Sequence, residues 1–208
     1  MVKASKAKIA VLVSGGGTNL QALLDAEDSG ALKSGNIVLV VSNNPNAYAL
    51  ERAERRGVET AVADKARYPT QEEFETYLNS LLEKREIDLI ILAGFMRILT
   101  ENFTKNWPRR ILNVHPALIP SFCGKGFYGI KVHEAALAYG VKVTGATVHF
   151  VNEVPDGGEI LLQKAVPVRK DDTPEILQRR VMEQAEWKLL PRAAELVSRE
   201  IVQGRAKK

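Results

Sequence analysis

Apolar runs alternate with helical patterns through the first half of the chain. Residues 8–14, 36–42 and 88–93 are apolar almost throughout, without the polar alternation of a half-exposed strand. Such runs are typical of strands that are covered on both faces. Because helical patterns lie between them, they indicate a parallel sheet with right-handed crossovers. The sequence therefore predicts an α/β fold with a Rossmann-like, mostly parallel sheet flanked by helices.

Shorter elements complete this part of the predicted fold. Thr70 is a favourable helix N-cap, and Glu73, three residues later, completes a capping box. We expect further helices from residue 19 to about 28, at 48–56 and from 70 through 85, and further strands at 59–62 and 111–114.

The last third of the chain has a different pattern. Two long strand-like stretches, 144–152 and 159–170, flank the turn signal Pro155-Asp156-Gly157-Gly158. This predicts an antiparallel, hairpin-like addition to the sheet. Pro174 is suited to an early helical position, so a long C-terminal helical region should begin there. We expect it to reach about residue 202 and to be interrupted at Pro191.

Composition bounds the class of protein. The chain has 208 residues, of which 45% are hydrophobic and 26% charged, as in ordinary globular domains. One domain over residues 1–208 can bury a core without disulfides or metals. The single cysteine, Cys123, excludes an internal disulfide and a multi-cysteine metal site, and it fits a reducing, cytoplasmic setting.

Charge and hydropathy set further expectations about partners. No apolar run approaches the ~20 residues of a membrane span, so no membrane partner is expected. The net charge of +4 is a weak indication of anionic ligands, and part of it lies in the last four residues. A basic stripe with interleaved aromatic residues is not seen, so no nucleic-acid partner is expected.

The glycine-rich segment 14–19, Ser-Gly-Gly-Gly-Thr-Asn, follows the first predicted strand and opens a helix. Glycines let the backbone approach an anion, and the helix N-terminus supplies free N–H groups and a partial positive charge. The segment matches neither G-x-G-x-x-G nor the nucleotide P-loop. A monophosphate is therefore favoured over a dinucleotide, and a simple tight turn is the alternative.

Asn113 and His115 lie at the end of the predicted strand 111–114. They are two residues apart, so their side chains leave the same face of the strand. Open α/β sheets place their active sites at the carboxyl ends of strands. An amide donor and an imidazole there could polarise a carbonyl group and shuttle a proton. The alternative is a polar strand end whose hydrogen bonds are satisfied locally.

The other candidate groups depend on what surrounds them. Asp156 is a turn former unless its loop reaches His115, where a carboxylate would raise the pKa of the imidazole. His149 lies in an apolar strand and is more typical of a core residue than of a ligand. His133 begins a helical stretch. Three histidines and one cysteine at this spacing make a weak zinc site, so no metal is predicted.

Five segments together resemble the phosphoribosylglycinamide formyltransferases, the folate-dependent enzymes of the third step of purine synthesis. The resemblance runs in order from about residue 8 to 197. The segments are SGGGTN at 14–19, LAGFMRIL at 92–99, NVHPALIP at 113–120, GATVHF at 145–150 and DGG at 156–158.

The resemblance implies direct transfer of a formyl group from 10-formyltetrahydrofolate to the amine of glycinamide ribonucleotide. Neither a metal nor a covalent intermediate is needed. Asn113 would donate to the formyl oxygen, and His115 would be the acid–base group. Asp156 would raise the pKa of His115 and order a water molecule.

The resemblance also implies which residues bind the two substrates. Residues from about 1 to 100 would form the phosphate-binding half, and those from about 101 to 208 the catalytic and folate half. The ribonucleotide would contact Gly16, Gly17, Thr18, Asn19 and Glu186. The folate would contact Met96, Arg97, Ile98, Leu99, Asn113, Asn152, Glu153, Val154, Pro155 and Asp156. Supporting roles would fall to Thr147, His133 and His149.

Several questions stay open at this stage. Residues 121–129 depart from the best-known bacterial pattern, and Gln71 stands where the family often has a folate-binding arginine. A cis peptide at Ile119–Pro120 is one expectation for the tight chain path there. Both a monomer and a homodimer fit the sequence.

Other classes of protein remain as alternatives. Methionyl-tRNA formyltransferases carry an extra C-terminal domain and formyltetrahydrofolate hydrolases an extra N-terminal one, so length favours the purine enzyme. A non-enzymatic nucleotide-binding regulator would account for the glycine segment but would leave Asn113, His115 and Asp156 unexplained.

Overall fold

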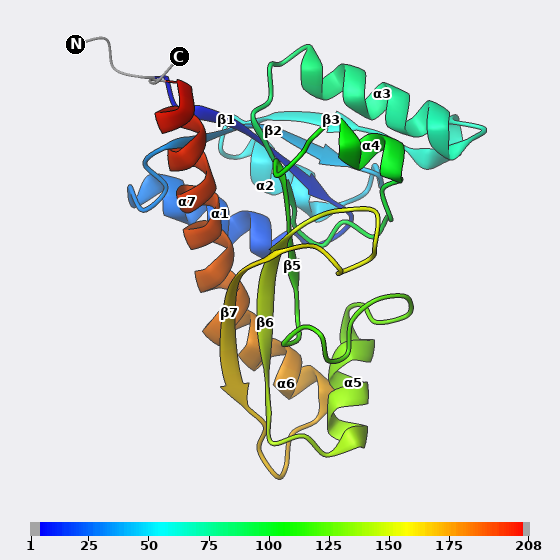
Figure 1. Cartoon of the computed structure of the whole chain (residues 1–208), viewed down its shortest axis with the longest axis vertical. Coiled ribbons are helices and arrows are strands. Elements are labelled where there is room, and N and C mark those ends of the chain that lie inside the picture. The colour runs from blue at the N-terminus through cyan, green and yellow to red at the C-terminus, as the bar shows by residue number, and fades with distance from the viewer. Residues whose placement is uncertain (1–4, 206–208) are drawn as a thin grey trace.

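A seven-stranded sheet forms the centre of the protein (Figure 1), whose computed structural model describes residues 5–205. The strand order is β3-β2-β1-β4-β5-β6-β7. Neighbours from β3 to β5 pair in parallel, whereas β6 pairs antiparallel with both β5 and β7. The strands are β1 (Ala7–Val13), β2 (Gly35–Ser42), β3 (Glu59–Val62), β4 (Leu89–Leu92), β5 (Ile111–His115), β6 (Val143–Phe150) and β7 (Ile160–Pro167). The predicted Rossmann-like α/β fold with an antiparallel C-terminal addition is confirmed.

Helices cover both faces of this sheet. They are α1 (Thr18–Asp28), α2 (Tyr48–Glu54), the 3-10 turn η1 (Lys65–Arg67), α3 (Gln71–Glu83), α4 (Glu101–Lys105), α5 (Ile130–Tyr139), α6 (Pro174–Val181), the π-helical turn η2 (Met182–Glu186) and α7 (Trp187–Arg205). The predicted cap of α3 is confirmed, because the Thr70 side chain accepts from the Glu73 amide. The short helix α4 was not predicted from the sequence.

Alternate residues of β1 point into two separate apolar cores. Ile9 and Val11 belong to the core formed with α1, α2, α6 and α7. Ala10 and Leu12 belong to the core on the other face, with side chains of α3 and α4 such as Phe74. This is why the first strand is apolar throughout: both of its faces are buried.

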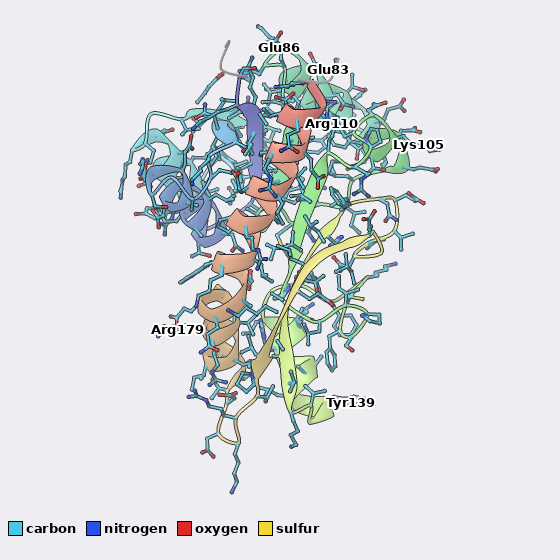
Figure 2. All side chains as sticks on the ribbon, turned by 60° about the vertical axis from the view of Figure 1, so that its left-hand side comes forward. Glu83, Glu86, Lys105, Arg110, Tyr139 and Arg179 are labelled. Atoms are coloured by element: carbon cyan, nitrogen blue, oxygen red, sulfur yellow. The ribbon has the colours of Figure 1, made fainter. Side chains whose placement is uncertain are left out.

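The C-terminal helical region departs from the prediction at Pro191. Helix α7 continues through Pro191 and runs along the sheet toward the end near Arg110 (Figure 2). The irregular turn lies earlier, at Met182–Glu186, where the Trp187 amide donates to the Met182 carbonyl. Proline removes one backbone hydrogen bond, but the buried side chains of Leu189, Leu190 and Ala193 hold α7 on the sheet on both sides of it. Among the described residues, no helix is both long and apolar enough to cross a membrane.

Candidate active site

The antiparallel pairing of β5 with β6 brings four polar side chains together. Asn113 lies opposite His149, and His115 lies opposite Thr147. The Asn113 Nδ2 atom is 3.2 Å from His149 Nε2, while His149 Nδ1 is 2.9 Å from the Phe150 carbonyl oxygen. Because a carbonyl can only accept, His149 Nδ1 carries a proton, and Nε2 can accept from Asn113 whenever it carries none.

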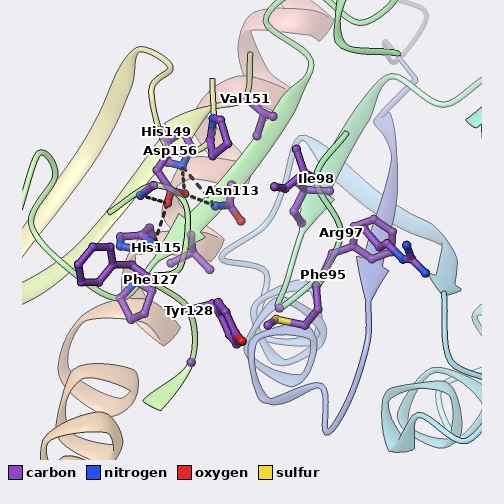
Figure 3. A pocket seen from close by; sticks show the side chains of 18 of the residues that line it. Phe95, Arg97, Ile98, Asn113, His115, Phe127, Tyr128, His149, Val151 and Asp156 are labelled. Atoms are coloured by element: carbon purple, nitrogen blue, oxygen red, sulfur yellow. Dashed lines mark hydrogen bonds and ion pairs between the residues drawn. The ribbon is translucent and has the colours of Figure 1, made fainter. Parts of the chain in front are cut away.

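The Asp156 carboxylate enters this group from the turn that follows β6 (Figure 3). Its Oδ2 atom lies 3.4 Å from His115 Nδ1 and accepts from the Gly124 amide at 2.9 Å. Its Oδ1 atom lies 3.4 Å from Asn113 Nδ2 and 3.6 Å from His149 Nε2. The loop therefore does reach His115. Asp156 thus meets the condition under which it is a candidate site residue and not only a turn former.

Gly158 explains how the turn can return so closely to β6. A Cβ atom at this position would lie 1.7 Å from the Phe150 carbonyl oxygen. A side chain cannot be accommodated there without moving the backbone. The second glycine of the D-G-G segment thus fixes the path that carries Asp156 over the strand ends.

The loop 121–129 closes over His115. Its Phe122 carbonyl accepts from His115 Nε2 at 2.8 Å, and the Gly124 amide binds Asp156 from the same loop. Ile119–Pro120, just before the loop, is a cis peptide bond, as expected from the tight chain path. The loop is therefore part of the site, a point that the sequence left open.

The pKa of His115 lies below its ordinary value of 6.5 because burial disfavours the charged ring. Asp156 and the Phe122 carbonyl both act to raise it, but burial outweighs them. Asp156 thus acts to raise the His115 pKa, as expected, but burial leaves the net pKa below its ordinary value. Burial also acts to raise the pKa of Asp156, yet His149, His115 and the Gly124 amide hold that pKa below 3.8. At neutral pH an ionised carboxylate therefore faces a mostly neutral imidazole.

The glycine segment lies between β1 and α1. Gly17 is the N-cap of α1 and has a left-handed backbone with φ 71°. A Cβ atom there would lie 2.6 Å from the Ala49 Cβ atom, so this glycine also lets α2 pack against the loop. Thr18 follows it, and its hydroxyl lies 3.9 Å from the sulfur of Met182. Tight-turn packing and anion binding are thus compatible uses of this segment.

Asn19 and Glu186 form a buried polar pair beside it. The Asn19 amide Nδ2 donates to Glu186 Oε2 at 2.8 Å, and within the described chain Asn19 Oδ1 has no partner. Burial raises the pKa of Glu186 to about 7, and the Asn19 hydrogen bond offsets only part of this effect. Near neutral pH this carboxyl group is therefore divided between its neutral and ionised forms.

A cavity of about 760 Å³ joins these groups. Figure 3 shows Arg97 and Ile98 across it from Asp156. Of the predicted site residues, its lining includes Asn19, Met96, Arg97, Ile98, Leu99, Asn113, His115, His133, His149, Asn152, Val154, Pro155, Asp156 and Glu186. Five others are not among the residues that line it: Gly16, Gly17, Thr18, Thr147 and Glu153.

Two predicted supporting residues have different surroundings. The Thr147 hydroxyl donates to the Ala117 carbonyl at 2.7 Å and accepts from the Ile119 amide at 3.1 Å, so it fixes the segment after His115. His133 is fully buried, and its two ring nitrogens have no partner among residues 5–205. Burial, with a smaller contribution from His115, lowers the pKa of His133 to about 4.

Gln71 lies at the edge of the expected folate segment. Its Nε2 atom donates to Glu75 Oε1 at 2.8 Å and to the Ile98 carbonyl at 3.3 Å. It therefore holds the backbone of the segment in place where the family often has an arginine.

Sequence reasoning missed several lining residues. Gln178, Met182 and Glu186 follow one another at four-residue spacing, which places them on one face of a helix. That spacing could have led from Glu186 to the other two. The missed residues include Leu92, Phe95, Lys125, Phe127, Tyr128, Gln178 and Met182.

Comparisons with known proteins identify the family of the chain. The formyl transferase family matches residues 7–194. The trifunctional purine biosynthetic protein adenosine-3 of Gallus gallus is 46% identical over 202 residues, covering 97% of this chain and 19% of that protein. This chain thus spans about a fifth of the length of that relative.

Two further relatives are matched along most of their length. Phosphoribosylglycinamide formyltransferase of Haemophilus influenzae is 40% identical over 184 residues, covering 88% of this chain and 84% of that protein. The crystal structure of glycinamide ribonucleotide transformylase 1 from Symbiobacterium toebii has a TM-score of 0.89 and 41% identity, covering 95% of this chain and 90% of that one. The chain therefore belongs to the formyl transferase family and, within it, to the phosphoribosylglycinamide formyltransferases.

Proposed function

We propose that the chain transfers a formyl group from 10-formyltetrahydrofolate to the amine of glycinamide ribonucleotide, in de novo purine synthesis. The convergence of Asn113, His115 and Asp156 on one cavity carries the proposal. Similarity to phosphoribosylglycinamide formyltransferases along most of the chain supports the identity of the substrates.

The first step is attack of the primary amine on the formyl carbon. A new N–C bond forms, and negative charge develops on the former carbonyl oxygen. The Asn113 amide lies at the strand end, where its contact to His149 at 3.2 Å fixes its orientation before the substrate arrives. Its longer contact to Asp156, at 3.4 Å, would give way so that the second N–H can donate to the formyl oxygen. One such pre-organised donor is worth roughly 10²–10³ in rate.

The second step moves a proton and breaks the bond to N10 of the folate. His115 is mostly neutral at neutral pH, so it can accept a proton from the attacking amine. The imidazolium that results is stabilised by the Asp156 carboxylate 3.4 Å away, directly or through a water molecule. The proton then passes to N10 as the C–N10 bond breaks. Such acid–base catalysis contributes roughly 10²–10⁴.

The two substrates would occupy different parts of the cavity and its rim. The phosphate would bind the amides of Gly16 and Gly17 and the start of α1 at Thr18, with Asn19 and Glu186 beside the ribonucleotide. The folate would lie between residues 96–99 and the turn 152–156, which includes Glu153. The exposed side chains of Met96, Ile98 and Val154 supply the apolar surface that a flat ring system requires.

The single-domain organisation is part of the proposal. Residues from about 1 to 100 would supply the phosphate loop and those from about 101 to 208 the catalytic groups. The continuous sheet from β3 to β7 supports this division of labour within one unit.

One assay tests the function. Protein, 10-formyl-folate and glycinamide ribonucleotide are mixed, and the folate absorbance is followed. We expect a change that requires the ribonucleotide. Turnover without it would instead indicate a hydrolase, and absence of turnover with both substrates would favour a non-enzymatic nucleotide-binding regulator.

A further inference from the structure

We propose that Arg52 is a positioning residue for the phosphate of the substrate. From helix α2 it binds the back of the glycine loop, so that the amides of Gly16 and Gly17 face an anion on the other side. This inference rests on the proposed function, because it concerns how the same phosphate loop is held.

The orientation of the amides follows from their own peptide groups. The Gly15 carbonyl accepts from the Ala49 amide at 3.0 Å, and the Gly16 carbonyl accepts from Arg52 Nε at 2.8 Å. Both donors belong to α2. In a trans peptide the C=O and N–H bonds point in opposite directions. The N–H groups of Gly16 and Gly17 therefore point away from α2.

These two amides are free to bind a ligand. Gly16 is exposed, Gly17 is half-buried, and within residues 5–205 neither amide donates to another protein group. Gly17 has a left-handed backbone, and successive N–H groups in such a turn form a concave site for anions. The N-terminus of α1 adds its partial positive charge at the same place. One side of the loop is thus bound by α2, and the other is open.

Arg52 is itself held in one orientation. Its Nη1 atom donates to Gln21 Oε1 at 2.9 Å, and its guanidinium carbon lies 5.0 Å from the centre of the Tyr48 ring. Gln21 belongs to α1, so a single guanidinium group connects α1, α2 and the loop between β1 and α1. A lysine has one compact donor group and cannot reproduce this fork.

Arg55 provides a matched control on the same helix. Its guanidinium carbon lies 5.6 Å from the centre of the same Tyr48 ring. It donates to Glu51 Oε2 at 3.2 Å and to the Tyr48 hydroxyl at 3.1 Å, and it does not bind the glycine loop. Replacing either arginine with methionine removes the same charge, but only Arg52→Met frees the Gly16 carbonyl.

Steady-state kinetics of the whole chain test the proposal. We expect Arg52→Met to raise KM for glycinamide ribonucleotide about tenfold, as expected for the loss of one charge-assisted hydrogen bond. The kcat and the KM for 10-formyltetrahydrofolate should stay within about twofold, because the catalytic groups lie on β5 and the turn after β6. Arg52→Lys should remain close to Arg52→Met, and Arg55→Met close to the wild type.

Three results for the ribonucleotide KM would overturn the proposal. The first is an unchanged KM in Arg52→Met. The second is a wild-type KM in Arg52→Lys, and the third is an equal rise of the KM in Arg55→Met. Either of the last two would show that the positive charge alone is the cause. A general structural defect would lower kcat and raise both KM values together, and this result also counts against the proposal.

A binding measurement separates this inference from the proposed function. If the wild type does not formylate the ribonucleotide, the proposed function fails, and calorimetric titration with inorganic phosphate still tests Arg52. Weaker binding of phosphate to Arg52→Met than to the wild type and Arg55→Met would support the inference, and equal binding would overturn it.

Discussion

The two halves of the candidate site are built in different ways. At the glycine loop the proposed ligand-binding groups are backbone amides, and α2 holds them through contacts to neighbouring carbonyls. At β5 and β6 the proposed reactive groups are side chains, and an antiparallel pairing aligns Asn113 with His149. Under the proposed function, binding would thus depend on the conformation of the loop, whereas catalysis would depend on strand register and on a buried charge.

The electrostatic surroundings differ in the same sense. The glycine loop is largely exposed, so it would attract an anion mainly through the orientation of its peptide dipoles. His115 is only 4% exposed and faces an ionised Asp156, so its pKa is lowered mainly by burial, against the opposing effects of Asp156 and the Phe122 carbonyl. Changes in the first region should therefore alter ribonucleotide binding, and changes in the second should alter turnover.

The largest effect is expected at the buried charge. Asp156→Asn should lower kcat by about 10²–10⁴, because the imidazolium loses its counter-charge. It should also lower the pKa of His115 further, since Asp156 is the main group that raises it. Kinetics and NMR titration of the His115 ring protons measure the two effects. Asp171→Asn, at an exposed position, is the control, and an unshifted His115 titration would contradict this account.

A somewhat smaller effect is expected from the amide donor. Asn113→Ala should reduce kcat by about 10²–10³ while the fold persists, because it removes one donor to the developing oxyanion. Turnover and thermal unfolding are measured together, with Asn102→Ala on the exposed side of α4 as the control. Wild-type-like turnover would exclude Asn113 from the reaction.

The buried carboxyl group of Glu186 should appear in the pH dependence of stability. Its pKa is about 7 in the folded protein, against an ordinary value of 4.5. Between pH 4.5 and pH 7 the Glu186 carboxyl group is mostly protonated in the folded state and mostly ionised in the unfolded state. The free energy of unfolding should therefore fall as the pH rises from about 4.5 through 7. Glu186→Gln should remove this pH dependence and raise the free energy of unfolding by up to about 3 kcal/mol above pH 7.

Urea unfolding at pH 5 and pH 8 checks this expectation. Glu183→Gln, an exposed position in the same π-helical turn, is the matched control and should keep the wild-type slope. If the free energy of unfolding changed equally with pH in the wild type and in Glu186→Gln, the pKa of Glu186 would not be raised to about 7.

The smallest effect is expected at the loop glycines. Gly17→Ala should destabilise the fold by about 1–2 kcal/mol from its left-handed backbone alone, and the close approach of Ala49 adds to this. At Gly16 a Cβ atom would meet nothing within 4 Å, so Gly16→Ala is the control for stability. The two denaturation midpoints are compared, and coincident midpoints would remove the packing role assigned to Gly17.

Local sequence patterns predicted most of the strands and helices of the fold. The apolar runs of β1, β2 and β4 and the Thr70 cap depend on neighbouring residues, and the structure has them as predicted. Helix α4 was missed because it is a short element, residues 101–105. The interruption expected at Pro191 was wrong because packing of α7 on the sheet outweighs one missing hydrogen bond.

The candidate site was less accessible to local reasoning. From neighbouring residues alone, Asn113 and His115 were a polar strand end and Asp156 a turn former. Only the family resemblance joined them, because their proximity depends on the β5–β6 pairing and on the tight return at Gly158. The Phe122 carbonyl on His115 and the Arg52 contact to Gly16 gave no sequence signal, since both depend on tertiary contacts.

The pairing of β5 with β6 has a consequence for how the chain can vary in length. A one-residue insertion or deletion between Thr147 and His149 would turn every following side chain of β6 to the opposite face and remove His149 from Asn113. On the outer side, the β6–β7 register already shifts between Val148 and His149 without disturbing the inner pairs. Changes in length should therefore accumulate in β7 and its loops, while the stretch from Thr147 to His149 keeps a fixed number of residues.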